Sequence, residues 1–358
     1  MKAIAVNRDD RTPELIDLPR PDPGPGEALV RTLRVGVDGT DHEVIAGTHG
    51  GFPAGEDRLV LGHEAVGVIE DAGGTDLEPG SVVVPTVRRP AGEDTEAFDR
   101  GQPDMAPAGT YHERGIDGAH GFMAEYVTSP AEYLVTLPPH LAPLGFLVEP
   151  LSVVEKALAH ARASRSAFEW TPESAIVLGN GSLGLLALAT LAEREEFDRL
   201  YCLGRRDRPD PTIDVIEGLG ATYVDSRETP VESLPSAHEP MDLIFEATGV
   251  PRHAFRSIEA LAPNGVLALL GVPGPQSLEI DAGDLHRDLV VNNKAVVGSV
   301  NSNRAHFEAA IETLGALPGW FLDDVVTGVH PVAEFERAFR DDDTTIKTAV
   351  EFDVHEER

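Results

Sequence analysis

The sequence predicts an α/β protein in which a mostly β first domain precedes a doubly wound domain with a parallel sheet. Short apolar runs broken by Gly and Pro dominate residues 1–150, whereas helical and strand patterns alternate over residues 151–303. In the second region one strand-like run enters a glycine-rich turn that leads into an apolar helix. The chain of 358 residues is long enough for two separate cores.

The first region contains strand-like runs at residues 2–6, 27–37, 64–72, 81–86 and 122–128. Runs of this length, separated by turn residues, are typical of a small β domain. Residues 88–118 are rich in Gly, Pro and charge and predict a long surface lobe. A helix after residue 303 and a strand at 347–352 are expected to return to this domain. We therefore expect a first domain of residues 1–150 completed by 304–358, and a second domain of residues 151–303.

The second region alternates regularly between the two kinds of element. Helices are expected at residues 152–163, 185–195, 212–219 and 252–261. Strands are expected at 175–178, 199–203, 221–224, 241–247, 265–270 and 295–299. Strands joined by helices in this order form parallel sheets with helices on both faces.

The glycine-rich turn predicts a dinucleotide site. Residues 175–178 read as a buried strand, and residues 179–184 have the spacing G-x-G-x-x-G before the helix. Gly179 allows a tight turn, Gly181 lets backbone approach a pyrophosphate, and Gly184 lets the helix pack on the strand. Ser182 and Leu183 lie within this turn and are expected to contact the cofactor too, just before the helix, whose N-terminus favours negative charge.

The end of the following strand indicates which dinucleotide binds. An acidic residue there would hold the ribose 2′-hydroxyl of NAD, but this chain continues with Gly204, Arg205, Arg206, Asp207 and Arg208. Arginines can bind a 2′-phosphate through two parallel hydrogen bonds, so NADP is favoured over NAD, which remains possible. The alternative is that these arginines are solvated surface residues.

Composition restricts the partners and the compartment. There are 61 acidic and 29 basic residues, giving a formal net charge of −32, which repels nucleic acid and anionic membranes. Because 41% of the residues are hydrophobic, the chain can form a core. We interpret the acidic residues as the solvated surface of a folded, halophilic protein that loses stability on desalting. The single cysteine, Cys202, and the absence of a signal peptide or a membrane-spanning apolar run predict a cytoplasmic protein.

Polar groups in the first region could bind a metal ion. Asp38, His63 and Glu64 lie at the ends of apolar segments, and Glu149 precedes the second domain. One His with carboxylates and an open position could form a catalytic zinc site. Read singly, His63 could equally be a core histidine and Glu64 a surface acid, so the residues alone leave this open.

At these positions the chain resembles the zinc-dependent medium-chain dehydrogenase/reductase superfamily. The segments GHE (62–64), EPL (149–151) and the glycine turn have the order of that superfamily. The segments GAHGFMAEY (118–126), LVEPLSVVEKAL (147–158) and NKAVVGSVNSNRAHF (293–307) more narrowly resemble archaeal glucose 1-dehydrogenases, and the acidic composition resembles the haloarchaeal ones. The resemblance implies a GroES-like catalytic domain followed by a Rossmann domain.

The resemblance also implies roles for individual residues. Asp38 stands where the family usually has a cysteine ligand, His63 and Glu149 match metal ligands, and Glu64 would bind directly or through water. Thr40 would accept the substrate's proton, although it could instead cap a helix over residues 41–46. Glu113 and Asn301 match sugar contacts, with His112 a weaker neighbour, although Glu113 could be a solvated acid. One catalytic zinc and no structural zinc are expected, since residues 88–118 contain no cysteine.

Further cofactor contacts are expected where parallel strands end, because a parallel sheet binds ligands at its carboxyl edge. These residues are Thr248, Gly249, Leu270, Gly271, Val272, Ser299, Val300 and Asn301.

The implied activity is oxidation of β-D-glucose at C1 to glucono-1,5-lactone by zinc-assisted hydride transfer to NADP. The partners would be a small aldose and a second copy of the chain, as a homodimer or homotetramer. The competing hypotheses are another zinc-dependent polyol or alcohol dehydrogenase, a zinc-free NADPH quinone reductase, and a non-enzymatic acidic binding protein.

Overall fold

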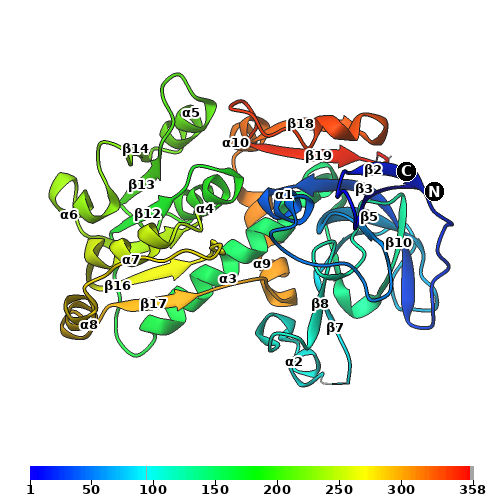
Figure 1. Ribbon diagram of the computed structural model, residues 1–358, viewed down its shortest axis with the longest axis horizontal. Helices are drawn as coiled ribbons and strands as arrows, with labels where there is room; N and C mark the ends of the chain where they lie inside the picture. The colour runs from blue at the N-terminus through cyan, green and yellow to red at the C-terminus, as the bar shows by residue number, and fades with distance from the viewer. Residues whose placement is uncertain (94, 355–358) are drawn as a thin grey trace. The chain divides into compact units, whose positions relative to one another are not determined.

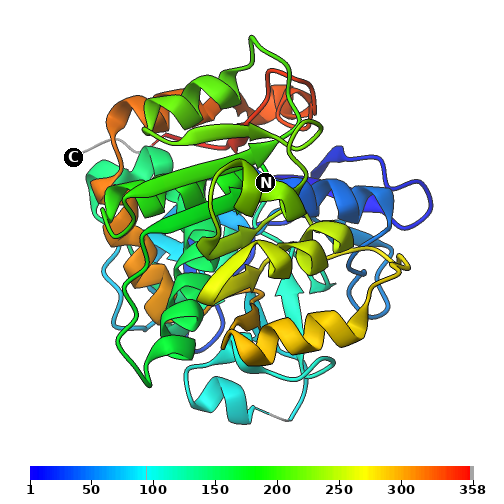
Figure 2. The same cartoon turned by 90° about the vertical axis from the view of Figure 1, so that its left-hand side faces the viewer.

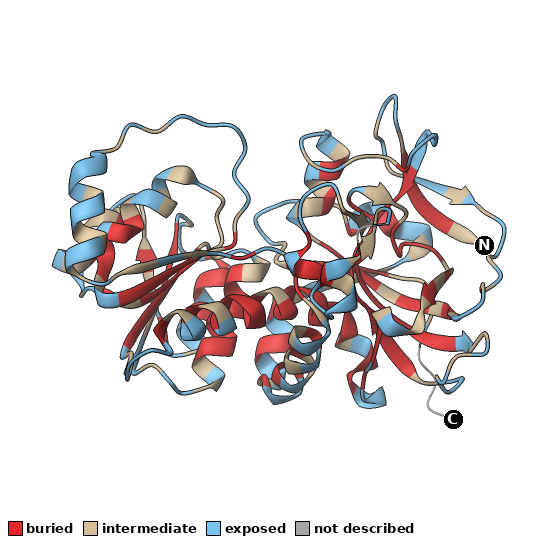
Figure 3. Ribbon diagram, turned by 90° about the horizontal axis from the view of Figure 1, so that it is seen from below, coloured by how far each residue is buried: buried red, intermediate tan, exposed pale blue. Residues whose placement is uncertain are grey.

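The computed structural model describes residues 1–93 and 95–354, which fold into two compact units (Figure 1). Unit 1 comprises the described residues of Met1–Ser152, Asn301–Gly315 and Val326–Arg358, and unit 2 comprises Val153–Val300 and Ala316–Val325. In both units the buried residues lie mainly on the strands and on the helix faces packed against them (Figure 3). Among the described residues no helix combines the length and the apolar character needed to cross a membrane.

Unit 1 is built mainly of strands. Its strands are β1 (Lys2–Asn7), β2 (Glu14–Asp17), β3 (Glu27–Val37), β4 (Arg58–Val60), β5 (Glu64–Asp71), β6 (Val82–Pro85), β7 (Arg88–Pro90), β8 (Tyr111–Arg114), β9 (Gly118–Ala119), β10 (Tyr126–Pro130), β11 (Leu134–Thr136), β18 (Val326–Pro331) and β19 (Lys347–Glu351). Its helices are α1 (Gly39–Ala46), α2 (Glu96–Asp99), η1 (Pro103–Met105), η2 (Ala131–Tyr133), η3 (Pro139–Leu147), the start of α3 (Val148–Arg165), α9 (Arg304–Ala316) and η5 (Val332–Arg337).

The main sheet of unit 1 brings distant parts of the chain together. Its order is β11-β6-β5-β3-β19-β18, and β10 also pairs with β3. The late strand β19 lies antiparallel to β3, with Thr348 opposite Val37. Strand β3 pairs on its other side with β5, with Gly36 opposite Glu64. As a result, the carboxyl end of β3, the start of β5 and the start of β19 are neighbours.

Unit 2 is a doubly wound α/β domain. It contains β12 (Ser174–Leu178), α4 (Ser182–Glu193), β13 (Arg199–Gly204), α5 (Pro211–Gly218), β14 (Thr222–Asp225), η4 (Val231–Ser233), α6 (Leu234–Ala237), β15 (Met241–Glu246), α7 (Pro251–Ala260), β16 (Leu261–Leu269), α8 (Ala282–Val291), β17 (Ala295–Gly298) and α10 (Gly319–Val325). The parallel sheet has the order β14-β13-β12-β15-β16-β17. Because the order reverses at β12, right-handed crossovers place α4 and α5 on one face and α7 and α8 on the other, and helices flank the sheet in Figure 2.

These elements confirm the predicted fold class and most of the predicted strands and helices. The predicted strand at 122–128 begins only at Tyr126, because Met123 and Ala124 instead bind the edge of β1. The predicted lobe contains the sheet β7-β8-β9 and helix α2, which the sequence pattern did not reveal. Residues 316–325 were expected in the first domain, but α10 packs in unit 2, where Trp320 lies against Gly218.

Candidate active site

The predicted glycine turn joins β12 to α4. Gly179 has φ +112°, a conformation that favours glycine, and a Cβ atom at Gly184 would lie 1.9 Å from the Gly179 carbonyl oxygen. A Cβ atom at Gly181 would meet nothing within 4 Å. Gly181 is the N-cap of α4, whose first residues are Ser182 and Leu183. The turn therefore packs tightly on the sheet side and is open at Gly181, as the approach of a pyrophosphate requires.

The loop after β13 carries the predicted arginines. Gly204 ends β13 and Arg205, which follows it, is exposed. The backbone of Arg206 is fixed by Tyr223, whose hydroxyl accepts from the amide at 2.7 Å and donates to the carbonyl at 3.0 Å. Asp207, the acidic residue of this loop, is paired with Arg227 at 2.7 Å. The positive charge of Arg227 offsets the negative charge of the Asp207 carboxylate, so the loop does not repel a phosphate group.

The other predicted cofactor residues in unit 2 lie at one edge of its sheet. The strand register aligns Leu178 with Glu246, Glu246 with Leu269, and Leu269 with Gly298. The predicted residues that follow these strand ends are Thr248, Gly249, Leu270, Gly271, Val272, Ser299 and Val300. The glycine turn contacts this group, since a Cβ atom at Gly179 would lie 3.1 Å from Thr248. Asn301 belongs to unit 1 and is described with the lobe below.

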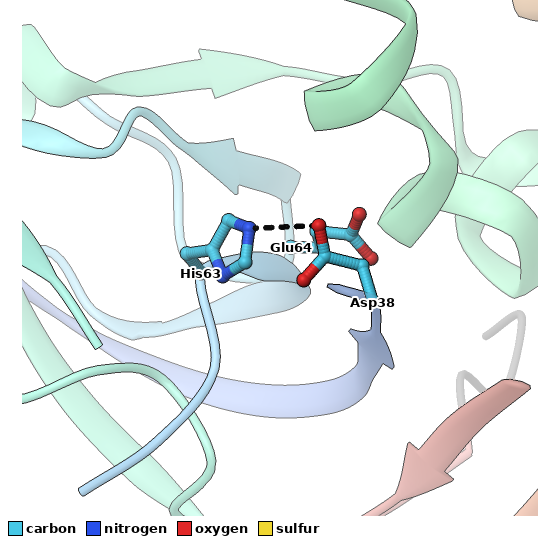
Figure 4. A group of neighbouring side chains, drawn as sticks. All are labelled: Asp38, His63 and Glu64. Carbon is cyan, nitrogen blue, oxygen red and sulfur yellow. Dashed lines mark ion pairs between the residues drawn. The ribbon is translucent and has the colours of Figure 1, made fainter. Parts of the chain in front are cut away.

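The predicted metal ligands of unit 1 form a cluster. Asp38 follows β3, His63 precedes β5, and Glu64 is the first residue of β5, so the pairing of β3 with β5 brings them together. The three side chains point toward one another in Figure 4, and one ligand atom of each lies within 4.8 Å of the others. The His63 Nε2 atom is 3.6 Å from Asp38 Oδ2.

Glu149 and Thr40 take different positions around this cluster. Glu149 is a buried residue in the first turn of α3, where Pro150 is tolerated because the first helical N–H groups have no partner within the helix. Its side chain belongs to the same electrostatic neighbourhood, since Glu64 and Asp38 affect its pKa. Thr40 lies in the first turn of α1. The alternative that Thr40 caps this helix is wrong: the N-cap is Asp38, whose side chain accepts from the Asp41 amide at 3.1 Å.

Asp41 is a buried member of the cluster to which the sequence analysis gave no role. Its Oδ1 atom is 3.9 Å from His63 Nδ1, the ring nitrogen on the far side from Asp38. Within the described residues neither atom has a hydrogen-bond partner. Asp41 can therefore orient the His63 ring while Nε2 faces the other candidate ligands. Its spacing of three residues from Asp38, which closes a capping box, was the available signal.

Lys347 is a second residue that the sequence analysis missed. It begins β19, its side chain is fully buried, and its Nζ donates to Glu64 Oε2. Gly36 makes room for this pair, because a Cβ atom there would overlap the Glu64 carboxylate. The scarcity of lysine in this chain draws attention to Lys347, but nothing in the sequence connects residue 347 with residue 64.

The electrostatics of the cluster favour a bound cation. Burial raises the pKa of Asp41 to about 7 and that of Glu149 to about 8, because both carboxyl groups lose water and lie near other acids. Burial also raises the pKa of Glu64, although the charge of Lys347 opposes the shift. Burial would likewise raise the pKa of Asp38, but the interactions with His63, the charge of Lys347 and the Asp41 amide together outweigh burial and lower that pKa.

For the basic residue His63, burial and the neighbouring carboxylates shift the pKa in opposite directions. Burial would lower the pKa of His63, but the carboxylates of Asp38 and Asp41 raise it well above its ordinary value. Because the carboxyl groups outnumber His63 and Lys347, a divalent cation would compensate the remaining charge. Imidazole and carboxylate ligands with an unpartnered imidazole nitrogen facing a second carboxylate fit zinc.

The two predicted sugar contacts meet in unit 1, where Asn301 reaches Glu113 of the lobe. Glu113 in β8 accepts from Asn301 Nδ2 at 3.2 Å, through its Oε1 atom. His112, the weaker candidate, packs its ring against Gly118, where a Cβ atom would lie 2.1 Å from His112 Nδ1. The alternative that Glu113 is a solvated acid is wrong, because its side chain is only 13% exposed and pairs with Arg88.

The nucleotide-type turn of unit 2 and the buried His–carboxylate cluster of a β domain together define the class of alcohol dehydrogenases with a GroES-like domain. Residues 24–139 match the family model described as "Alcohol dehydrogenase GroES-like domain". Residues 142–352 match the model "Glucose dehydrogenase C-terminus". This chain therefore belongs to the glucose dehydrogenase family.

Similar proteins agree with this assignment. "Glucose 1-dehydrogenase" of Haloferax mediterranei is 67% identical over 354 residues, covering 98% of this chain and 99% of that protein. "Glucose 1-dehydrogenase" of Halobacterium salinarum is 66% identical, covering 99% of this chain and 100% of that protein. A solved structure of the Haloferax mediterranei enzyme in complex with NADP, Zn and gluconolactone has a TM-score of 0.98, at 66% identity over 99% of this chain and all of that one.

Proposed function

We propose that this chain is a glucose 1-dehydrogenase that oxidises β-D-glucose at C1 to glucono-1,5-lactone, with one catalytic zinc and NADP, and with NAD as a weaker alternative. The observation that carries the proposal is the cluster of half-buried Asp38 with buried His63 and Glu64 in a member of the glucose dehydrogenase family. The similar enzyme whose structure is known was solved with the same metal, cofactor and product class.

The proposed metal ligands are Asp38, His63 and Glu149, with Glu64 binding directly or through water. When bound, zinc would supply polarisation of the sugar C1 hydroxyl, and NADP⁺ would supply the hydride acceptor. The Asp41 carboxylate, with Oδ1 3.9 Å from His63 Nδ1, faces that side of the ring and would orient it. Thr40 accepts the proton that leaves the C1 hydroxyl and passes it outward, while Lys347 holds the Glu64 carboxylate in place.

The cofactor is proposed to lie along the carboxyl edge of the unit 2 sheet. Gly179, Gly181, Ser182, Leu183 and Gly184 would bind the pyrophosphate. Arg205 and Arg206, after Gly204, would bind the 2′-phosphate. The residues at the ends of β15, β16 and β17 would contact the nicotinamide half. Support comes from the exposed position of Arg205 and from the pairing of Asp207 with Arg227, which offsets the charge that would repel a phosphate.

We further propose the domain division expected from the sequence, with a catalytic domain of residues 1–150 completed by 304–358 and an NADP-binding domain of residues 151–303, apart from residues 316–325, which pack in unit 2. We also propose a cytoplasmic homodimer or homotetramer. Support for self-association comes from β17, which within the described residues pairs only with β16 and lies at the end of the sheet. The valines at 290, 291, 296 and 300 are exposed beside it.

The decisive experiment is a substrate screen with NADP in molar salt, with and without a chelator. We expect glucose to be oxidised faster than sorbitol or ethanol, the chelator to abolish turnover, and added zinc to restore it. Faster turnover of sorbitol or ethanol would favour another zinc-dependent polyol or alcohol dehydrogenase. Activity that resists the chelator would favour a zinc-free reductase, and no turnover at all would favour a binding protein.

Cofactor choice has its own measurement. Replacing Arg205 by Ser should lower kcat/KM for NADP about tenfold or more, since a charged hydrogen bond to phosphate is lost, and should leave that for NAD nearly unchanged. A wild-type enzyme that strongly prefers NAD would contradict the assignment.

A further inference from the structure

Arg88 in the lobe is a buried cation outside the cluster of candidate metal ligands, and its side chain is only 3% exposed. Its Nε atom donates to Glu113 Oε1 at 2.9 Å. On the other side of the guanidinium group, Nη1 donates to the backbone carbonyl of Asp104 at 3.0 Å. The guanidinium also lies over the ring of Tyr111, 3.7 Å from the ring centroid. These contacts fix the plane and the position of the group.

The strand register creates the Arg88–Glu113 pair. Strands β7 and β8 are antiparallel, and Arg88 lies directly opposite Glu113. Directly opposed residues have neighbouring Cβ atoms, so the strand register itself places the two side chains within contact distance. The planar guanidinium group of Arg88 donates hydrogen bonds in two directions at once, to the Glu113 carboxylate and to the backbone of η1, and the position of the pair depends on both. A lysine ammonium at this position could not reach both in one fixed geometry.

One oxygen of Glu113 is fully used by this arrangement. Oε1 accepts from Arg88 Nε and from Asn301 Nδ2, and a carboxylate oxygen accepts about two hydrogen bonds in total. Asn301 is itself held, because its Oδ1 accepts from the Ser302 amide at 2.8 Å. Over residues 1–93 and 95–354, Oε2 of Glu113 receives no hydrogen bond. The carboxylate is thus anchored through one oxygen and has the other ready for a ligand hydroxyl.

We propose that Arg88 is a positioning residue that presents Glu113 Oε2 to one hydroxyl of the sugar and so determines which aldoses the site accepts. This inference rests on the proposed function, since it assumes an aldose substrate. A carboxylate held in one orientation accepts a hydroxyl at one carbon only, and a sugar that lacks or inverts that hydroxyl leaves Glu113 Oε2 without this hydrogen bond. Without Arg88, the carboxylate can rotate and this selection is lost.

The test compares Arg88→Met with the wild type in molar salt, using glucose and a panel of sugars that each lack or invert one hydroxyl. Arg88→Met should raise the KM for glucose about tenfold to a hundredfold, while the KM for NADP and the zinc content stay the same. For the one sugar without the hydroxyl that meets Glu113, wild type and variant should be equally poor. Arg88→Lys, which keeps the charge but cannot bind Glu113 and the Asp104 carbonyl in one fixed geometry, should give an intermediate KM.

Arg89→Met is the matched control. Arg89 is the next residue of β7, but it donates to the Thr86 carbonyl and to Ser129 Oγ rather than to Glu113. It should lose stability as Arg88→Met does and keep the wild-type order of sugar preference. Should Arg88→Met not fold, the double variant Arg88→Met, Glu113→Gln removes the unpaired charge. Its order of sugar preference should then equal that of Glu113→Gln alone.

Three outcomes would overturn the inference. An unchanged KM for glucose in a folded Arg88 variant would show that Arg88 does not act on the substrate. An equal loss on every sugar of the panel would assign Arg88 a structural role only. The same result for Arg89→Met would show that the effect is not specific to Glu113. A wild-type protein that oxidises no aldose with NADP would instead contradict the proposed function.

Discussion

The interior of unit 2 around β12 is mainly apolar, whereas the interior of unit 1 around β3 and β5 holds a cluster of ionisable side chains. Every residue of β12 is buried and α4 packs on it through leucines and alanines. In unit 1, Asp41, His63, Glu64 and Lys347 are each at most 4% exposed. The hydrophobic stabilisation of buried apolar side chains has no preferred direction and depends on how well they fill space. A buried charged side chain is stable only when a partner of opposite charge lies beside it.

This difference predicts that the two units lose stability through different kinds of substitution. Unit 2 should be destabilised by changes in side-chain volume, and unit 1 by changes in side-chain charge. The glycine turn of unit 2 is local in sequence, whereas the cluster in unit 1 needs four separate segments. The following predictions test this contrast, from the largest effect to the smallest.

Replacing Lys347 by Met should have the largest effect on stability. The variant leaves Glu64 buried without its cation, which costs about 3–5 kcal/mol in the free energy of unfolding. Denaturant unfolding in molar salt measures it. Lys2→Met is the control, because the Lys2–Asp17 pair is 45% and 76% exposed and should cost less than about 1 kcal/mol. Equal losses in the two variants would remove the contrast between buried and exposed charge.

Asp41→Asn should lower the affinity for zinc about 10- to 100-fold, because the His63 ring loses the carboxylate that orients it. Competition with a chelator of known affinity measures the change. Asp10→Asn is the control, since Asp10 is exposed at a surface turn, and its variant should bind zinc as the wild type does. An Asp41→Asn protein with wild-type zinc affinity would show that Asp41 has no part in binding.

Gly184→Ala should destabilise unit 2 by about 1–3 kcal/mol, since the added methyl group collides with the Gly179 carbonyl. Gly181→Ala should change stability by less than about 0.5 kcal/mol, because the site is open, and should raise the KM for NADP. Thermal unfolding and NADP kinetics measure the two effects. A reversal of these results would mean that the turn does not bind the cofactor as proposed.

Cys202 should show no reaction with an alkylating reagent in the folded protein. It is fully buried in β13, and burial raises the pKa of its thiol to about 12, so almost no thiolate forms at neutral pH. Mass spectrometry along a denaturant series should show alkylation only as unit 2 unfolds. Rapid alkylation under native conditions would contradict an apolar, closed interior.

The sequence predicted unit 2 better than the cluster in unit 1 for a physical reason. Apolar periodicity and the glycine spacing are local patterns, so β12, the turn and α4 could be placed from about twenty residues. In unit 1, Asp38 and His63 were found because they end apolar runs and resemble a family motif. Lys347 was missed because its partner lies 283 residues away, and only the pairing of β19 with β3 brings it to Glu64.

The lobe shows the same limit. Its Gly, Pro and charged residues hide the short strands β7 and β8, so the opposition of Arg88 and Glu113 could not be read from the sequence. Glu113 itself was found by resemblance. That its two oxygens differ, one anchored and one unpartnered within the described residues, follows only from the strand register and from the position of Asn301.

The place of Lys347 in the chain also affects the order in which the molecule can be made. Synthesis runs from the N-terminus, so Asp38, His63 and Glu64 leave the ribosome long before residue 347 exists. Until β19 adds to the edge of β3, the Glu64 carboxylate has no ammonium partner and must stay hydrated or protonated. The interior of unit 1 can therefore close around Glu64 only after β19 has joined the sheet.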